Sequence, residues 1–157
     1  HPALLFGPDI SVVTSRWNEL DRCSTAITNS VNGINRVVVA VGGVVALKNM
    51  KIRKGSLTKP RLDLLRCADD IVMRLTEKAG LQQTIWQFPV ILLPLSFGRG
   101  ETIVLRPIES QEAMTVNFYR MEAALLQRIV NQLLHLPDIG AVLYDITNKP
   151  PATIEWE

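Results

Sequence analysis

Apolar positions along the chain follow helical spacing in three stretches. Residues three or four apart repeat over about 15–31, 58–80 and 121–135, which predicts three helices. A glycine follows the first two stretches and Pro137 follows the third, and both residue types end helices. The third helix is expected to turn an apolar face inward through Leu125, Leu126, Ile129, Val130 and Leu133.

Continuous apolar or β-branched stretches predict strands between these helices. They cover 3–6, 36–47, 84–97, 102–108 and 141–146. We expect Gly7-Pro8 to end the first strand and Gly42-Gly43 to bend the second. Gly98-Arg99-Gly100 is typical of a hairpin that joins the third and fourth strands.

The order of helix, turn and strand at Trp17–Val39 recurs about 105 residues later, at Glu122–Tyr144. Because the identity is low, two ordinary αβ units that match by coincidence are the alternative. We interpret the chain as an α+β fold of duplicated αβ units, with mixed β-sheets and helices packed on one face. Residues 1–83 form the first unit, and residues 84–157 form the second unit with a C-terminal tail.

Composition narrows the class of protein. The 157 residues are 47% hydrophobic and 20% charged, which excludes a disordered chain. The longest apolar run, Phe88–Leu95, holds two prolines and is too short to cross a bilayer. Seventeen basic and fifteen acidic residues give a net charge of +2, too weak for a dedicated nucleic-acid binder. The chain opens at His1 without an initiator Met, so we expect a piece of a longer protein.

Residues that often carry chemistry are scarce. Cys23 and Cys67 lie far apart, without metal-ligand spacing, and indicate free thiols in a reducing compartment. His1 and His135 are equally isolated, so we expect no metal site. The motifs GxSxG and HExxH and a Walker loop are absent from the sequence.

A basic connector, residues 48–61, carries six Lys and Arg residues without interleaved aromatic side chains. A solvated loop is the favoured interpretation, because single-stranded nucleic acid needs aromatic stacking platforms. The connector leaves one alternative function open: an α+β module without enzymatic activity that binds RNA or another protein.

The tail after the last strand combines a double proline with Lys149, Glu155 and Trp156. The prolines predict a stiff, extended path that loses little entropy when it docks. Lys149 suits a phosphate oxygen, Glu155 can accept two hydroxyl hydrogen bonds, and Trp156 can anchor the end by burial. From these residues alone, an arm that clamps a ligand and a docked structural tail are equally favoured.

Three segments carry a family resemblance: YDITNKPPATIEWE (Tyr144–Glu157), RPIESQEAMT (Arg106–Thr115) and QFPVIL (Gln87–Leu92). They closely resemble the C-terminus of glutamine-hydrolysing GMP synthase, the third segment that of its longer, eukaryotic-type form. The resemblance is strong from Trp86 onward and weaker over 1–83, where VNGINRVV is the familiar run.

This resemblance implies a part of a cytosolic ligase that converts XMP, ATP and glutamine to GMP, AMP, pyrophosphate and glutamate. The implied partners are XMP and the upstream ATP-pyrophosphatase and glutamine amidotransferase domains, where ATP and Mg²⁺ are used. It implies no catalytic residue and no cofactor in this chain, which completes the XMP pocket. The family's C-terminal domain is a dimerisation domain. Because of the repeat, we hypothesise that this chain depends less on a homodimer than shorter relatives do.

By position in these segments, Gln87, Lys149 and Glu155 match family residues that contact XMP, with Ile154 beside them. Lys149 is expected to bind the 5′-phosphate, Glu155 polar atoms of the nucleotide, and Gln87 to act as an amide partner. The alternative for Gln87 is a strand-edge amide with a structural role.

One position departs from the family pattern. The family usually has Arg just before the apolar run of the last strand, where this chain has Ala141. A cation for the phosphate is therefore either missing or replaced by Arg36 or Arg106.

Overall fold

The computed structural model describes residues 2–6, 9–112 and 115–156. In this part of the chain, one mixed sheet has the strand order β1-β2-β9-β6-β4. Parallel pairs join β1 (Pro2–Phe6) to β2 (Arg36–Gly43) and β6 (Glu101–Leu105) to β9 (Ile139–Asp145). Antiparallel pairs join β2 to β9 and β6 to β4 (Val90–Leu93). The predicted α+β class with mixed pairing is confirmed.

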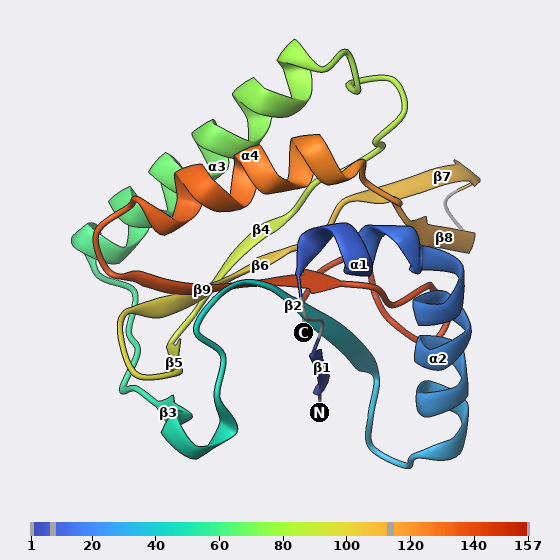
Figure 1. Ribbon diagram of the computed structural model, residues 1–157, viewed down its shortest axis with the longest axis horizontal. Coiled ribbons are helices and arrows are strands. Elements are labelled where there is room, and N and C mark those ends of the chain that lie inside the picture. Colours follow the sequence, from blue (N-terminus) through green and yellow to red (C-terminus); the bar gives the residue numbers. More distant parts are fainter. Residues whose placement is uncertain (1, 7–8, 113–114, 157) are drawn as a thin grey trace.

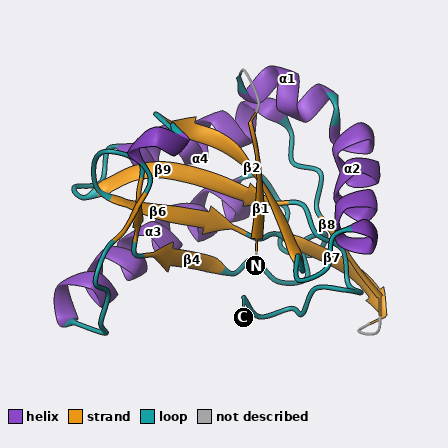
Figure 2. Ribbon diagram, turned by 90° about the horizontal axis from the view of Figure 1, so that it is seen from below, coloured by secondary structure: helices purple, strands orange, loops and turns teal. Residues whose placement is uncertain are grey.

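The helices lie on one side of this sheet, as predicted. Figure 1 shows α1 (Ile10–Ser15), α3 (Lys59–Lys78) and α4 (Ala123–Leu134) above the strands, with α2 (Trp17–Ser30) to one side, near the start of β2. In Figure 2, seen from below, the strands lie in front of α3 and α4. The opposite face of the sheet therefore carries no helix of the described chain.

The helix starts follow local hydrogen bonding and packing. Asp9 caps α1 by accepting from the Val12 N–H at 2.9 Å, so helical structure begins earlier than the predicted residue 15. A break at Arg16 separates α1 from α2. The inward face predicted for the third helix is confirmed, because all five of its side chains are buried in α4.

Several predicted strands are shorter than expected. β2 ends at Gly43, where φ is +82° and an added Cβ would lie 2.2 Å from the carbonyl oxygen of Gly140. The predicted bend is confirmed by a register shift between Ala40 and Gly42. The stretch 84–97 yields only β4 and β5 (Leu95–Ser96), because Pro94 has no N–H to continue the ladder.

Two small ribbons complete the structure and were not predicted. β3 (Lys51–Ile52) pairs with β5, and β7 (Ile108–Glu112) pairs with β8 (Thr115–Phe118). Figure 1 shows the second ribbon extending beyond the end of the main sheet, near α2. The last strand begins at Ile139 and ends at Asp145, close to its predicted bounds.

Buried side chains fill both faces of the sheet. The larger cluster lies under the helices and includes Trp17, Ile103 and Tyr144. On the helix-free face, Val38, Val104 and Leu143 form a smaller cluster.

The two predicted units share one sheet. Strands from 1–83 and 84–157 lie side by side, and α2–β2 and α4–β9 have the same order of helix and strand. The duplication and the domain boundary at residue 83 stay predictions. The predictions that concern His1, Gly7-Pro8 and Glu157 fall on residues outside the described part of the chain.

Candidate functional site

The four residues predicted to contact XMP lie near one end of the sheet, where β6 and β9 end and β4 begins. They are Gln87, Lys149, Ile154 and Glu155. Gln87 forms a backbone bridge with Ile108, and Lys149 forms one with Val116. The β7–β8 ribbon connects these bridges, because Ile108 pairs with Phe118. Gln87 is exposed, whereas Lys149 is half-buried. Backbone pairing thus brings the segment of Gln87 close to the start of the tail.

The start of the tail is fixed by contacts on both sides of its backbone. The Lys149 N–H donates to the Val116 carbonyl at 2.8 Å, and the Val116 N–H donates back at 3.3 Å. The Asn148 side chain accepts from the Phe118 N–H at 3.1 Å and donates to Asp21 at 2.7 Å. Since Asp21 belongs to α2, the helix and the ribbon together determine where Lys149 leaves the fold.

The double proline does not continue an extended path, contrary to the prediction. Both peptide bonds that precede Pro150 and Pro151 are cis. The Ala152 N–H donates to the Asn148 carbonyl, four residues earlier, at 3.3 Å, which closes a five-residue turn. The turn sends residues 153–156 back toward the ends of the strands, and Ala152 is buried.

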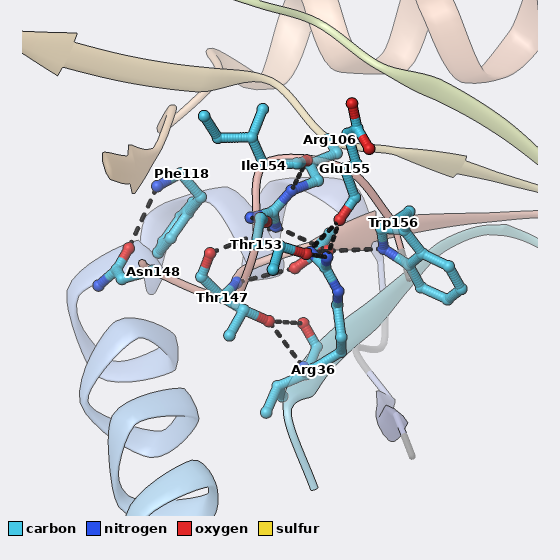
Figure 3. Close-up of polar contacts among 11 residues, drawn as sticks. Arg36, Arg106, Phe118, Thr147, Asn148, Thr153, Ile154, Glu155 and Trp156 are labelled. Carbon is cyan, nitrogen blue, oxygen red and sulfur yellow. Dashed lines mark hydrogen bonds and ion pairs between the residues drawn. The ribbon is translucent and has the colours of Figure 1, made fainter. Parts of the chain in front are cut away.

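Asp145, the last residue of β9, is the centre of a buried polar network. Figure 3 shows several of its partners, among them Arg36, Arg106 and Trp156. Its carboxylate forms ion pairs with Arg106 at 2.7 Å and Arg36 at 3.2 Å. It also accepts from the Trp156 indole at 2.7 Å and from the Thr147 N–H at 2.9 Å. Asp145 and Arg106 are fully buried and Arg36 is 2% exposed, so these charges are stable only because they are paired.

The two arginines also bind the tail backbone. Arg106 donates through Nε to the Ile154 carbonyl at 3.0 Å and through Nη2 to the Thr153 carbonyl at 2.7 Å. Arg36 donates through Nη2 to the Thr153 hydroxyl at 2.8 Å and to the Glu155 carbonyl. The irregular backbone of 153–155 therefore has its carbonyl groups satisfied by charged donors.

These contacts bear on the two alternatives for the phosphate cation. Arg36 and Arg106 are buried and bind Asp145 and the tail, which favours the alternative that this chain lacks that cation. Ala141, where the resemblance led us to expect an arginine, is a buried residue of β9 paired with Gly43 and Thr102.

The end of the described tail is docked. Trp156 packs against the smaller apolar cluster on the helix-free face, and the Arg36 guanidinium lies 5.7 Å from its ring centre. The predicted anchoring of Trp156 by burial is confirmed. Figure 3 shows the side chains of Ile154 and Glu155 pointing away from Arg36, although the backbone of Glu155 is bound to it.

Gln87 has an environment of its own. It lines a cavity of about 350 Å³ with residues of α3 and of the loop 81–88, among them Thr76, Trp86 and Phe88. Lys149, Ile154 and Glu155 do not line this cavity. The structure therefore brings Gln87 to the same end of the fold as the tail but not into one enclosed pocket with it.

Sequence reasoning missed the residues that hold the tail. Asp145, Asn148 and Asp21 were not singled out. For Asp145 the sequence offered a signal, because a carboxylate within the apolar run IGAVLYDI must be paired if it is buried. For Asp21 it offered none, since an acidic residue on a helix is ordinarily solvated.

The cysteines and the basic connector, which the sequence analysis also considered, lie elsewhere on the surface. Cys23 and Cys67 are exposed free thiols, and no cluster of metal-binding side chains occurs among the described residues. In the basic connector, Arg61 pairs with Glu101 at 2.9 Å, and the other basic residues are exposed. Within the described ranges, no helix is long and apolar enough to cross a membrane.

Comparison with known proteins gives the family. Residues 74–156 match the family described as GMP synthase C terminal domain. A probable glutamine-hydrolysing GMP synthase of Leptospira interrogans is 47% identical over 147 residues, which cover 92% of this chain and 24% of that protein. The glutamine-hydrolysing GMP synthases of Thermobifida fusca and Mycobacterium tuberculosis are 45% and 44% identical, over 66% of this chain.

The chain spans about a quarter of the length of the curated relatives it matches. The matches support the enzyme family and not the alternative RNA-binding or protein-interaction module. Similarity extends beyond the tail and includes β6, which Arg106 directly follows, and β9, which ends at Asp145. The chain belongs to the family of GMP synthase C-terminal domains.

Proposed function

We propose that the chain is the C-terminal part of a glutamine-hydrolysing GMP synthase and that it completes the pocket for XMP. The whole enzyme would convert XMP, ATP and glutamine to GMP, AMP, pyrophosphate and glutamate. ATP and Mg²⁺ would bind in an upstream ATP-pyrophosphatase domain, and ammonia would come from an upstream glutamine amidotransferase domain. The proposal places the enzyme in the cytosol and assigns no bond-making step to this chain.

The observation that carries the proposal is the fixed path of the tail. Lys149 leaves the fold from a backbone bridge, and Glu155 and Ile154 follow on a segment whose carbonyl groups are bound by buried arginines. We assign Lys149 to the 5′-phosphate, because an ammonium group is a compact charge suited to phosphate oxygens. Glu155 would accept from polar groups of the nucleotide, and Ile154 would pack beside it.

Gln87 would approach the nucleotide from the other side. It is exposed just before β4, in a segment that backbone bridges and the β7–β8 ribbon connect to Lys149. Its amide offers both a donor and an acceptor. The remaining wall of the pocket would come from the upstream domain, since the described residues place Gln87 and the tail in no common enclosed cavity.

Lys149→Ala in the full-length enzyme tests the proposal. We expect the KM for XMP to rise by about tenfold, because a charge-assisted hydrogen bond to phosphate is lost. Hydrolysis of glutamine, measured alone, should be preserved. Lys54→Ala is the matched control, since Lys54 is an exposed lysine of the basic connector. An unchanged KM for XMP in Lys149→Ala would remove Lys149 from the substrate site.

We further propose that this chain depends less on a homodimer than shorter relatives do. The observation behind this is that β1 and β2, from the first half of the chain, extend the sheet of the second half. Sedimentation of the full-length enzyme over a range of concentrations tests it. A dimer that persists at every concentration and is held through this domain would contradict it.

A further inference from the structure

The tail has no regular secondary structure of its own to set its course. Residues 153–156 belong to no strand and to no helix. Apart from the Thr153 hydroxyl, which donates to the Glu155 carbonyl at 2.6 Å, their described side-chain hydrogen bonds run to Arg36, Arg106 and Asp145, which are buried. The conformation of the tail therefore depends on these three side chains rather than on a backbone ladder.

The three residues come from the ends of three adjacent strands. Arg36 opens β2, Asp145 closes β9, and Arg106 directly follows β6. These strands are neighbours in the order β2-β9-β6. Side chains on adjacent paired strands have fixed spacing, so the network presents its donors to the tail as a rigid unit.

We propose that Arg36 and Arg106, joined by Asp145, are positioning residues that aim Ile154 and Glu155 at the nucleotide. This inference rests on the proposed function. Arg36 binds the carbonyl of Glu155, while the carboxylate of Glu155 points the other way (Figure 3). Neither arginine contacts substrate in this scheme. Both act through the tail, by bonds to its carbonyl groups and, for Arg36, also to the Thr153 hydroxyl.

Arginine is required because each guanidinium binds several acceptors at once. Arg106 reaches Asp145 and the carbonyls of Thr147, Thr153 and Ile154. A lysine offers one compact ammonium group and cannot span this set of acceptors.

Arg36 lies outside residues 74–156, the segment that matches the GMP synthase C terminal domain family. It bridges to Thr153 and Glu155 across 117 and 119 positions of sequence. The preceding segment of this chain thus supplies one of the two arginines that hold the tail. Within residues 74–156, the buried charged partners of residues 153–156 are Arg106 and Asp145.

Arg36→Met in the full-length enzyme tests the inference. Methionine keeps an unbranched buried side chain, and Asp145 retains its ion pair with Arg106. We expect about a tenfold rise in the KM for XMP, with kcat and the KM for ATP changed less than twofold. Hydrogen exchange of backbone amides in 148–156 should quicken, whereas exchange in α4 should not. Arg53→Met, at an exposed site of the basic connector, is the control.

Thr153→Val is a second test of the inference, needed because the substitution of buried Arg36 could itself impair folding. Thr153 is exposed, and its hydroxyl accepts from Arg36 at 2.8 Å. Its loss should raise the KM for XMP about threefold, without a change in melting temperature beyond that of Arg53→Met. Unchanged exchange and an unchanged KM in both variants would overturn the inference.

The two proposals fail in different ways. If Lys149→Ala raises the KM for XMP but Arg36→Met and Thr153→Val do not, the positioning role is wrong and the proposed function stands. If tail exchange quickens in Arg36→Met while Lys149→Ala and Glu155→Ala leave the KM unchanged, the tail is held by Arg36 but does not bind XMP. That result would overturn both proposals.

Discussion

The indole of Trp156 and the carboxylate of Asp145 share a hydrogen bond of 2.7 Å that ties the end of the described tail to the last strand. The same carboxylate is paired with two buried arginines, so the bond has a charged acceptor in a dry environment. The contact combines apolar packing of the ring with a polar bond at its edge.

Trp156→Phe separates these two contributions. Phenylalanine keeps an aromatic ring against the apolar cluster but loses the donor to Asp145. We expect the free energy of unfolding to fall by about 1.5–3 kcal/mol, the usual contribution of a hydrogen bond to a charged group. Chemical denaturation measures it. Trp86→Phe, at a tryptophan that is 43% exposed, is the control, and an equal loss in both variants would argue against the bond.

Gln87→Ala decides between the two interpretations of that residue. If its amide contacts the nucleotide, the KM for XMP of the full-length enzyme should rise about three- to tenfold, at unchanged thermal stability. If it is a strand-edge amide with a structural role, stability should fall and the KM should stay the same. Gln83→Ala is the matched control, because Gln83 is an exposed glutamine in the same loop.

The two tyrosines should ionise differently in alkali. Burial raises the pKa of Tyr144 well above its ordinary value of 10.0, and its hydroxyl donates to the Tyr119 carbonyl at 2.6 Å. The pKa of half-buried Tyr119 is also raised, first by burial and then by Glu109 and Glu122. Tyr119 should therefore ionise above pH 10 in the folded chain, and Tyr144 only at higher pH.

This difference makes stability depend on pH. Because the folded pKa of Tyr144 is raised, its contribution is fully present below the unfolded pKa of about 10 and is lost as pH rises toward the folded pKa. We expect absorbance of this 157-residue chain to show one tyrosine titrating reversibly and the second ionising together with unfolding. Reversible ionisation of both tyrosines before any loss of helical circular dichroism would contradict this expectation.

The spacing of apolar residues predicted the helices and strands that bury one regular face in the core. The face of α4 and the apolar run of β9 were found because burial imposes a regular spacing on helices and strands. The β7–β8 ribbon was missed. Its first strand, IESQE, is mostly polar and lacks the alternation that marks a half-buried strand.

The course of the tail could not be predicted in the same way. Two prolines favour an extended segment on local grounds, yet a turn and bonds from Arg36 determine its path. Arg36 is more than one hundred positions away in sequence, and nothing in its neighbourhood marks it as a partner of Thr153. The resemblance to GMP synthase indicated which tail residues to consider, and the buried network explains how they are held.

Gly140→Ala tests the close backbone contact between Gly140 of β9 and Arg99 in the hairpin of residues 98–100. A Cβ at Gly140 would lie 1.9 Å from the carbonyl oxygen of Arg99, a backbone atom that cannot move without shifting the hairpin. We expect a loss of about 3 kcal/mol or more in the free energy of unfolding.

The control is Gly80→Ala, where φ is +72° and nothing lies within 4 Å of the new Cβ, so the backbone conformation alone costs about 1–2 kcal/mol. Chemical denaturation of both variants gives the comparison. Equal losses would mean that the hairpin moves aside freely, and the contact would then have no part in fixing the start of β9.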